Sequence, residues 1–151
     1  MNAATAEAPI RRATAADLDA LVPLVREFYT VDRHSFDEAK IRRALEPLLA
    51  DDTYGVVWLI GEPVSGYAVI TWSYSLESGG RDALLDEIYV SRRGLGLGTR
   101  ALRAILSDLP ARGLTRMFLE TESHNADVRR FYARLGFRQE DSVWMVNELQ
   151  A

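Results

Sequence analysis

The spacing of the hydrophobic residues changes along the chain. Over residues 14–49 apolar side chains recur every three or four positions, which is the spacing of helices with one buried face. The segments from Tyr54 to Val90 are rich in β-branched and aromatic residues, which is typical of strands. After Gly98 the helical spacing returns and then gives way to further strand-like segments. The pattern therefore predicts two helices, a group of strands, and then alternating elements.

Turn residues and caps set the expected boundaries. Thr14 followed by Asp17 is the pattern of a capping box, so we expect a helix from there to about Tyr29. A second helix is predicted over Asp37 to Leu49 and later ones over Thr99 to Leu109 and Asn125 to Leu135. The expected strands cover residues 10–13, 54–60, 64–76, 84–90, 115–121 and 142–149.

The order of these elements predicts the fold class. Short turns join the three strands 54–60, 64–76 and 84–90, so these should form an antiparallel meander. A helix separates the strands 84–90 and 115–121, which should therefore run parallel. We expect an α+β fold, with a mixed, mostly antiparallel sheet of six to seven strands and about four flanking helices in an α/β sandwich. One domain should cover residues 10–151, after a disordered Ala-rich start at residues 1–9.

Composition narrows the chemistry. The 151 residues include no cysteine and two histidines, which excludes thiolate metal sites and a thiol-linked acyl-enzyme and disfavours a zinc site. A net charge of −4 argues against broad nucleic-acid binding. The apolar runs are too short for a membrane span or a signal peptide, so we expect a cytoplasmic protein with no membrane partner.

A glycine-rich stretch, Arg93-Gly94-Leu95-Gly96-Leu97-Gly98-Thr99, lies between a predicted strand and a predicted helix. Alternate glycines let backbone N–H groups turn toward one point, and the helix adds the positive end of its dipole. Such a loop suits a diphosphate-bearing cofactor. Two alternatives stay open: a turn without a ligand, and a dinucleotide-binding turn, for which Glu120 lies near the place of a ribose-binding acid.

A second motif is Asn125-x5-Phe131-Tyr132-x3-Gly136-Phe137. Together with Arg93-x-x-Gly96-x-Gly98 it resembles the GCN5-related N-acetyltransferase (GNAT) superfamily, whose members bind acetyl-CoA and transfer the acetyl group to an amine. The resemblance extends over nearly the whole chain, in the family's order of elements. It implies the fold expected above, acetyl-CoA as cosubstrate, no metal, and a homodimer as one expected state.

The resemblance also implies site residues. Backbone N–H groups from Arg93 to Thr99 (Arg93, Gly94, Leu95, Gly96, Leu97, Gly98, Thr99) would bind the CoA pyrophosphate, and the strand around Ile88, Tyr89 and Val90 would pair with the pantetheine arm. Asn125 matches an asparagine that contacts this arm, and Tyr132 matches a tyrosine beside the thioester sulfur. Two residues that are common in the family, one of them proline, are missing between Val90 and Gly96. Which of the nearby arginines contacts the phosphates stays open.

The reaction needs a base and an acid. An alkyl amine with a pKa of about 10.4 is mostly protonated at pH 7, and removing its proton costs roughly 4 kcal/mol. Asp86 and Glu87 are the candidate bases; alternation places them on opposite faces unless the strand is bulged, and we favour Glu87. Glu120 and Glu122 are secondary candidates. A phenol stays protonated at pH 7, so Tyr132 can protonate the leaving thiolate.

These observations predict an acetyl-CoA-dependent N-acetyltransferase that acts on a primary amine of a small molecule, by direct attack in a ternary complex. The acidic residues near the expected cleft favour a cationic amine. The alternatives are a non-catalytic acyl-CoA-binding module and an enzyme that acetylates a protein lysine or N-terminus. Aromatic residues of the middle strands are expected mainly in the core, although they could line the cleft: Trp58, Tyr67, Trp72 and Tyr74.

Overall fold

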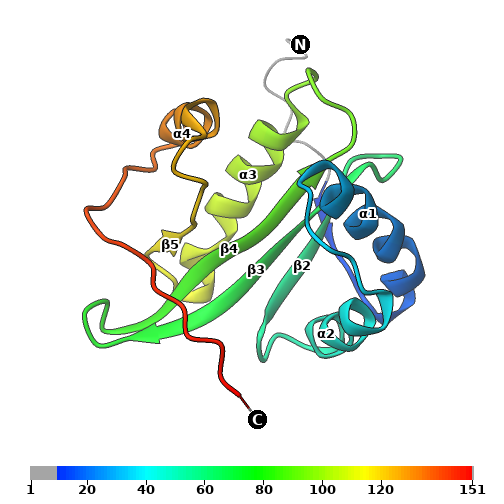
Figure 1. The fold of residues 1–151 in the computed structure, drawn as a ribbon, viewed down its shortest axis with the longest axis horizontal. Helices are drawn as coiled ribbons and strands as arrows, with labels where there is room; N and C mark the ends of the chain where they lie inside the picture. The colour runs from blue at the N-terminus through cyan, green and yellow to red at the C-terminus, as the bar shows by residue number, and fades with distance from the viewer. Residues whose placement is uncertain (1–9, 151) are drawn as a thin grey trace. The chain divides into compact units, whose positions relative to one another are not determined.

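The computed structural model describes residues 10–150, so the prediction for residues 1–9 lies outside the described part of the chain. The chain divides into two compact units, one up to Leu119 and one from Glu120 onward. The first unit contains the sheet and helices α1, α2 and α3, and the second contains helix α4 (Figure 1).

The sheet of the first unit has its five strands in sequence order. Neighbouring strands up to β4 are antiparallel, whereas β4 and β5 are parallel, as the sequence predicts. Short loops join β2 to β3 and β3 to β4, the connection from β1 to β2 contains α1 and α2, and the crossover through α3 makes the parallel pair. The strands are β1 (Ile10–Arg12), β2 (Gly55–Ile60), β3 (Gly66–Ser75), β4 (Gly80–Val90) and β5 (Met117–Phe118).

Helices α1 (Leu18–Val31) and α2 (Glu38–Ala50) cover one face of the sheet. A short 3-10 helix, η1 (Ala15–Asp17), precedes α1, and the predicted capping box is confirmed, because the Asp17 carboxylate accepts the Thr14 backbone N–H at 2.8 Å. The Asp37 side chain caps α2 by accepting the Lys40 N–H. The core on this face combines side chains of both helices with alternate residues of β2, β3 and β4, including Leu21, Leu45, Leu59, Tyr67 and Tyr89.

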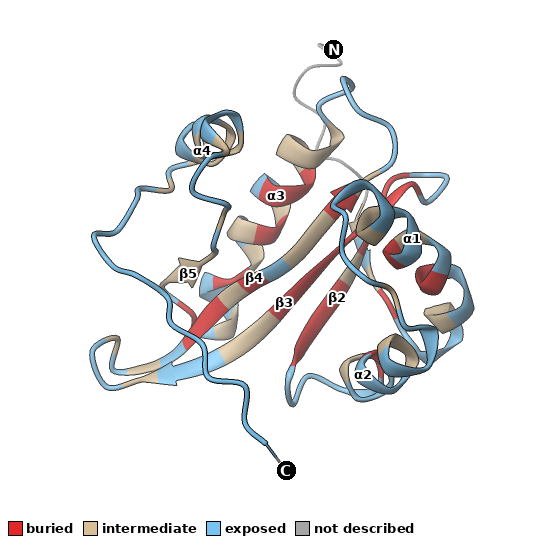
Figure 2. Ribbon diagram, in the orientation of Figure 1, coloured by how far each residue is buried: buried red, intermediate tan, exposed pale blue. Residues whose placement is uncertain are grey.

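Helix α3 (Leu97–Asp108) packs on the other face through Ala101, Leu102 and Ile105, all fully buried. Figure 2 shows that most of β2 and the first half of β3 are buried, that burial varies along β4, and that the helices are buried on their inner sides. A second 3-10 helix, η2 (Pro110–Arg112), ends at Gly113, where the sequence predicts a glycine stop. No helix in the described part of the chain combines the length and the hydrophobicity that crossing a bilayer requires.

Strand β4 contains a β-bulge. Val69 of β3 pairs with Glu87 and Ile70 pairs with Leu85, so Asp86 has no partner in the register. One extra residue breaks the alternation of side chains, and Glu87 therefore lies on the same face as Val69 and the α1 core. The expectation that Asp86 and Glu87 point to opposite faces does not hold in a bulged strand.

One strand prediction was wrong and another was too long, and the sheet has five strands instead of six to seven. The strand expected over 115–121 is reduced to Met117 and Phe118, and residues 142–149 form no strand in the described structure. Val143, Trp144, Met145 and Val146 are all more than 70% exposed. Their residue types favour strands, but a strand exists only where a neighbouring backbone supplies hydrogen bonds.

The second unit is organised around helix α4 (Ala126–Ala133). The Asn125 side chain accepts the Val128 N–H at 3.1 Å and so caps the helix at its first turn. The chain turns at Gly136, close to the predicted stop. This confirms a helix in the region, shorter than the predicted 125–135.

Candidate functional site

The carboxylate of Glu87 is held by two tyrosines. The Tyr29 hydroxyl donates to Glu87 Oε2 at 2.6 Å, and the Tyr67 hydroxyl donates to Glu87 Oε1 at 2.7 Å. Tyr29 comes from the end of α1 and Tyr67 from β3, so three separate elements meet at this carboxylate. Both of its oxygens therefore have a short hydrogen bond from a phenol.

Burial dominates the proton affinity of these groups. It raises the pKa of Glu87 above its usual value, while the hydrogen bonds from Tyr29 and Tyr67 act in the opposite direction. Burial and the nearby Glu87 charge raise the pKa values of Tyr29 and Tyr67 well above the usual value for a phenol. Both tyrosines therefore keep their protons at neutral pH and act as donors.

Asp86 is the unpaired residue of the bulge and is exposed. Its negative charge raises the pKa values of Glu87, Tyr29 and Tyr67, so Asp86 acts on the same cluster. Partial burial raises the pKa of Asp86 itself. The bulge thus brings both candidate bases close to one cluster, whereas a regular strand would place them on opposite faces.

Aromatic rings surround the Glu87 carboxylate on the α1 side. Phe28 contacts Tyr29, Tyr67 and Tyr89, with ring centroids between 5.4 and 6.5 Å apart. The Tyr89 hydroxyl donates to Glu27 at 2.6 Å; burial and this contact raise the pKa of Tyr89 to about 12, against a lowering by Arg93. The cluster therefore contains a second tyrosine–carboxylate pair.

The segment after α1 adds a histidine to this region. His34 Nε2 lies 2.7 Å from an Asp32 carboxylate oxygen, and the His34 ring meets the Tyr29 ring edge to face. The influence of His34 lowers the pKa of Glu87. Across the described residues, no three histidine, aspartate or glutamate side chains form a group that could hold a metal ion.

The glycine stretch forms an exposed turn between β4 and α3. Gly94 and Gly96 have φ angles of 83° and 70°, and a Cβ atom added to either would meet no atom within 4 Å. The backbone conformation therefore favours glycine there, although the space around it is open. Helix α3 begins at Leu97, earlier than the predicted Thr99, and its first-turn bond runs from the Arg100 N–H to the Gly96 carbonyl.

This turn suits an anionic ligand. The N–H groups of Leu97, Gly98 and Thr99 precede the first helical hydrogen bond and point out of the helix start, where the dipole is positive. Such an arrangement fits the diphosphate of a cosubstrate. Arg92 and Arg93 lie in the same exposed turn.

The backbone of β4 also has an open edge. Strand β5 pairs with β4 only at Ala83 and Leu84, so within the first unit no strand lies beside Ile88, Tyr89 and Val90 on that edge. Unpaired N–H and C=O groups along a strand edge can bind an extended, amide-containing ligand. This edge leads directly into the glycine turn.

Within the second unit, Tyr132 lies between two aromatic rings. Its ring centroid is 5.1 Å from that of Phe131 and 5.6 Å from that of Phe137. Burial raises the pKa of its hydroxyl, so it remains protonated at neutral pH. The Asn125 side-chain oxygen is engaged in capping α4, which leaves its N–H₂ group as donor. The exposed Glu120 and Glu122 belong to this unit too.

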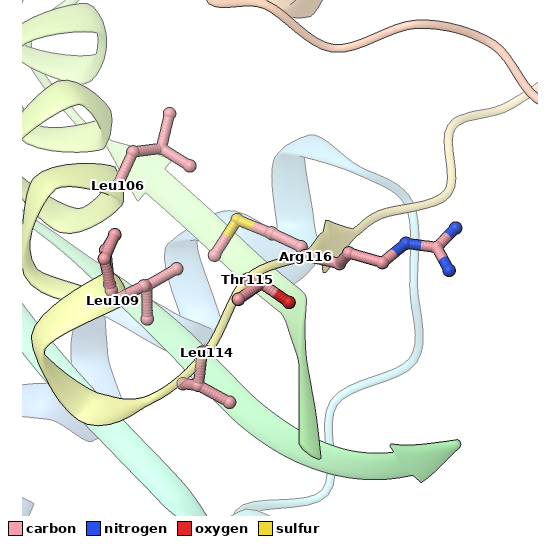
Figure 3. Close-up of a pocket in the computed structure, with 7 residues that line it drawn as sticks. Leu106, Leu109, Leu114, Thr115 and Arg116 are labelled. Carbon is pink, nitrogen blue, oxygen red and sulfur yellow. The ribbon is translucent and has the colours of Figure 1, made fainter. Parts of the chain in front are cut away.

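A separate hollow of about 310 Å³ lies beside the end of α3 (Figure 3). Leu106, Leu109 and Leu114 project toward it, while Arg116 points away. The Arg116 guanidinium instead lies over the Phe118 ring and donates to the Ser78 hydroxyl. The lining therefore offers apolar contact and no acid or base.

Sequence reasoning missed Tyr29 and His34 and treated Tyr67 only as an aromatic residue of a middle strand. Tyr67 is indeed fully buried, but its hydroxyl serves the carboxylate. Trp58 and Trp72 instead lie beneath arginine side chains, and Tyr74 is 75% exposed. The sequence signal for Tyr29 was its position near the end of the capped helix, next to the apolar residues of the buried face.

Comparisons with known proteins place these features in context. The acetyltransferase (GNAT) family matches the chain over residues 18–137. A crystal structure from Arthrobacter sp. FB24, assigned as an acetyltransferase, is 31% identical over 99% of this chain and 100% of its own, with a TM-score of 0.84. No protein with a curated description matches the sequence.

Two more distant structures share the fold. A structure from Clostridium acetobutylicum, assigned as an acetyltransferase and solved with acetyl-CoA, is 19% identical over 93% of this chain and 96% of its own, with a TM-score of 0.77. An aminoglycoside acetyltransferase from an uncultured soil metagenomic sample, in complex with sisomicin, is 16% identical over 95% and 97% of the two chains, with a TM-score of 0.76.

Proposed function

The chain belongs to the acetyltransferase (GNAT) family, and on that premise we propose that it transfers the acetyl group of acetyl-CoA to a primary amine of a small, cationic molecule. The amine attacks directly in a ternary complex, because the sequence contains no cysteine to carry an acyl group.

The observation that carries this proposal is the glycine turn that joins β4 to α3. The backbone N–H groups of this turn, from Arg93 to Thr99, would bind the pyrophosphate of acetyl-CoA, and the open edge at Ile88, Tyr89 and Val90 would pair with the pantetheine arm. Asn125 would add a contact to the arm through its amide N–H₂ group. The distant relative solved with acetyl-CoA supports this choice of cosubstrate.

The proposed proton transfers need a base and an acid. The Asp86 and Glu87 carboxylates form the basic centre that removes the ammonium proton of the acceptor. Tyr132 supplies a proton to the leaving sulfur, a role that its raised pKa permits at neutral pH. Acetyl-CoA, when bound, supplies the thioester that the amine attacks.

The charge of the basic centre favours a cationic acceptor. Asp86, Glu87 and Glu27 carry three carboxylates in the cluster on the α1 side, and the hydroxyl groups that contact Glu27 and Glu87 are neutral. A protonated amine is attracted to such a surface. The relative that was solved with sisomicin acts on aminoglycosides, which are polycationic amines, and this supports the same class here.

A screen for release of CoA thiol tests the proposal. Purified protein with acetyl-CoA is offered spermidine, amino acid amides, sisomicin and a lysine-containing peptide, and mass spectrometry identifies any acetylated product. We expect thiol release with a cationic small molecule. Thermal stabilisation by CoA without release on any amine would instead indicate a binding module, and release only with the peptide would indicate a protein acceptor.

A further inference from the structure

The two carboxylates of the bulge have different surroundings. Both oxygens of Glu87 accept hydrogen bonds from phenols, at 2.6 and 2.7 Å. The Asp86 side chain is exposed, and it has no hydrogen-bond or ion-pair partner among the side chains that the structure describes. One carboxylate is therefore fixed by the fold, and the other faces outward.

These surroundings suit different roles. A proton acceptor needs a lone pair that the substrate can reach, directly or through one water. The phenols already occupy one lone pair on each Glu87 oxygen, and their own pKa values are too high for them to give up the protons at neutral pH. Asp86 keeps all of its lone pairs available on the exposed side of the same cluster.

We infer that Asp86 is the base that takes the proton from the acceptor amine, and that Glu87 is a positioning residue, fixed by Tyr29 and Tyr67, which supplies a permanent negative charge beside it. The inference rests on the proposed N-acetyltransfer. It reverses the preference for Glu87 that the sequence suggested, because the sequence does not show the bulge or the two phenols.

The Asp86 carboxylate takes one proton from the ammonium group, and the freed nitrogen lone pair forms the C–N bond at the thioester carbonyl carbon. The C–S bond breaks with its electron pair on sulfur, which takes a proton from Tyr132. The acylated nitrogen gives a second proton back to Tyr132, and Asp86 later releases its proton to solvent. The products are the amide, CoA thiol and one proton.

Charged and titratable groups face this centre from each neighbouring element. Helix α1 contributes Tyr29 and Glu27, and strands β3 and β4 contribute Tyr67, Glu87 and Tyr89. The segment after α1 contributes His34, paired with Asp32. Because Glu87 and Tyr29 are hydrogen-bonded to each other, changing either should alter the field at Asp86 without removing the base.

Rates measured against pH separate the two roles. With an amine from the screen, starting with sisomicin and spermidine, Asp86→Asn should lower kcat/KM by about 10² or more at pH 7. The defect should shrink as the pH approaches the pKa of the acceptor amine, about 10.4 for a lysine-like group, because a neutral amine needs no base. Glu87→Gln and Tyr29→Phe should cost about tenfold or less and shift the rise of rate with pH without abolishing it.

Controls keep the result interpretable. Glu46→Gln removes an exposed carboxylate of α2 and should match the parent. Asp86→Glu should recover most of the rate, and circular dichroism and CoA binding report whether each variant is folded. In ligand-free protein with ¹³C-labelled carboxyl groups, Tyr29→Phe should move the titration of Glu87 to higher pH.

The outcomes are distinct. An unimpaired Asp86→Asn variant, or a Glu87→Gln variant with the larger, pH-dependent defect, overturns the inference while leaving N-acetyltransfer intact. An unmoved Glu87 titration in Tyr29→Phe overturns the positioning role. Absence of thiol release by the parent protein with every amine overturns the proposed function itself, and the inference with it.

Discussion

The Tyr29 hydroxyl donates a 2.6 Å hydrogen bond to Glu87 Oε2 across 58 residues of sequence. The bond joins the end of α1 to the middle of β4, next to the bulge at Asp86. It orients the carboxylate and fixes the end of the helix against the sheet, so one contact serves both the candidate chemistry and the packing.

Replacing Tyr29 with Phe should lower the free energy of unfolding by about 2 kcal/mol, because the bond to a charged partner is lost while the ring packing stays. Urea denaturation at pH 7 measures the change. Tyr74→Phe is the matched control, since that side chain is 75% exposed, and its unfolding should be unaffected. Equal stabilities of the two variants would contradict the contact.

Asp17→Asn should destabilise the protein by about 1 kcal/mol at pH 7. This figure is kept small because the Arg11 side chain is 56% exposed and solvent weakens its ion pair with Asp17. Hydrogen bonds from Arg11 and Thr14 lower the pKa of Asp17 from 3.8 to about 2. An acid whose pKa is lower in the folded state than in the unfolded state stabilises the folded state at pH values above its unfolded-state pKa. This contribution is lost as the pH falls through the folded-state pKa.

The difference between Asp17→Asn and the parent protein should therefore be constant above about pH 5 and shrink between pH 3.8 and about 2. Urea titrations at several pH values measure it. Asp141→Asn, at an exposed side chain outside the helices and strands, is the control. A difference that grows on acidification would refute the assigned direction.

Gly66→Ala should destabilise the sheet by about 2 kcal/mol or more. A Cβ atom at Gly66 would lie 2.3 Å from the Tyr89 carbonyl oxygen, so the β3–β4 ladder would have to move. Thermal unfolding measures the loss. Gly80→Ala, where an added Cβ meets nothing within 4 Å, should leave the melting temperature nearly unchanged, and a comparable loss there would argue against a steric cause.

Tyr132→Phe should lower kcat by about 10² while the dissociation constant for acetyl-CoA stays within twofold. The change removes the proposed proton donor and keeps the ring that packs against Phe131 and Phe137. Steady-state kinetics and calorimetric titration give the two quantities. Tyr54→Phe, at a side chain that is 61% exposed, provides the comparison. Unchanged turnover at every pH would remove Tyr132 from the acid role.

The parts of the fold that were predictable from the sequence carry local signals. The Thr14–Asp17 cap, the helix from Asp37 and the change of period at Tyr54 each depend on neighbouring residues. The parallel pairing of β4 and β5 followed from the intervening helix alone. Family membership could be recognised for the same reason, since its two motifs are short.

The features that the sequence did not predict depend on contacts between distant parts of the chain. The number of strands could not be derived from residue type, because Val143 to Val146 favour strands but have no paired neighbour. The position of the bulge depends on how β3 and β4 register, and a single extra residue decides which face Glu87 occupies. The contacts of Tyr29 and Tyr67 with Glu87 are set by helix docking, which no local pattern reports.

Beyond the ends of β2 and β5, the strands β3 and β4 continue as a two-stranded ribbon from Ser73 to Asp82, and Leu76 at its tip is 95% exposed. Its outer residues have no third strand to hold them, so their amide hydrogens should exchange with solvent sooner than those of the sheet interior. A protease cut at this tip would separate β1 to β3 from β4 onward while leaving every ladder pair intact.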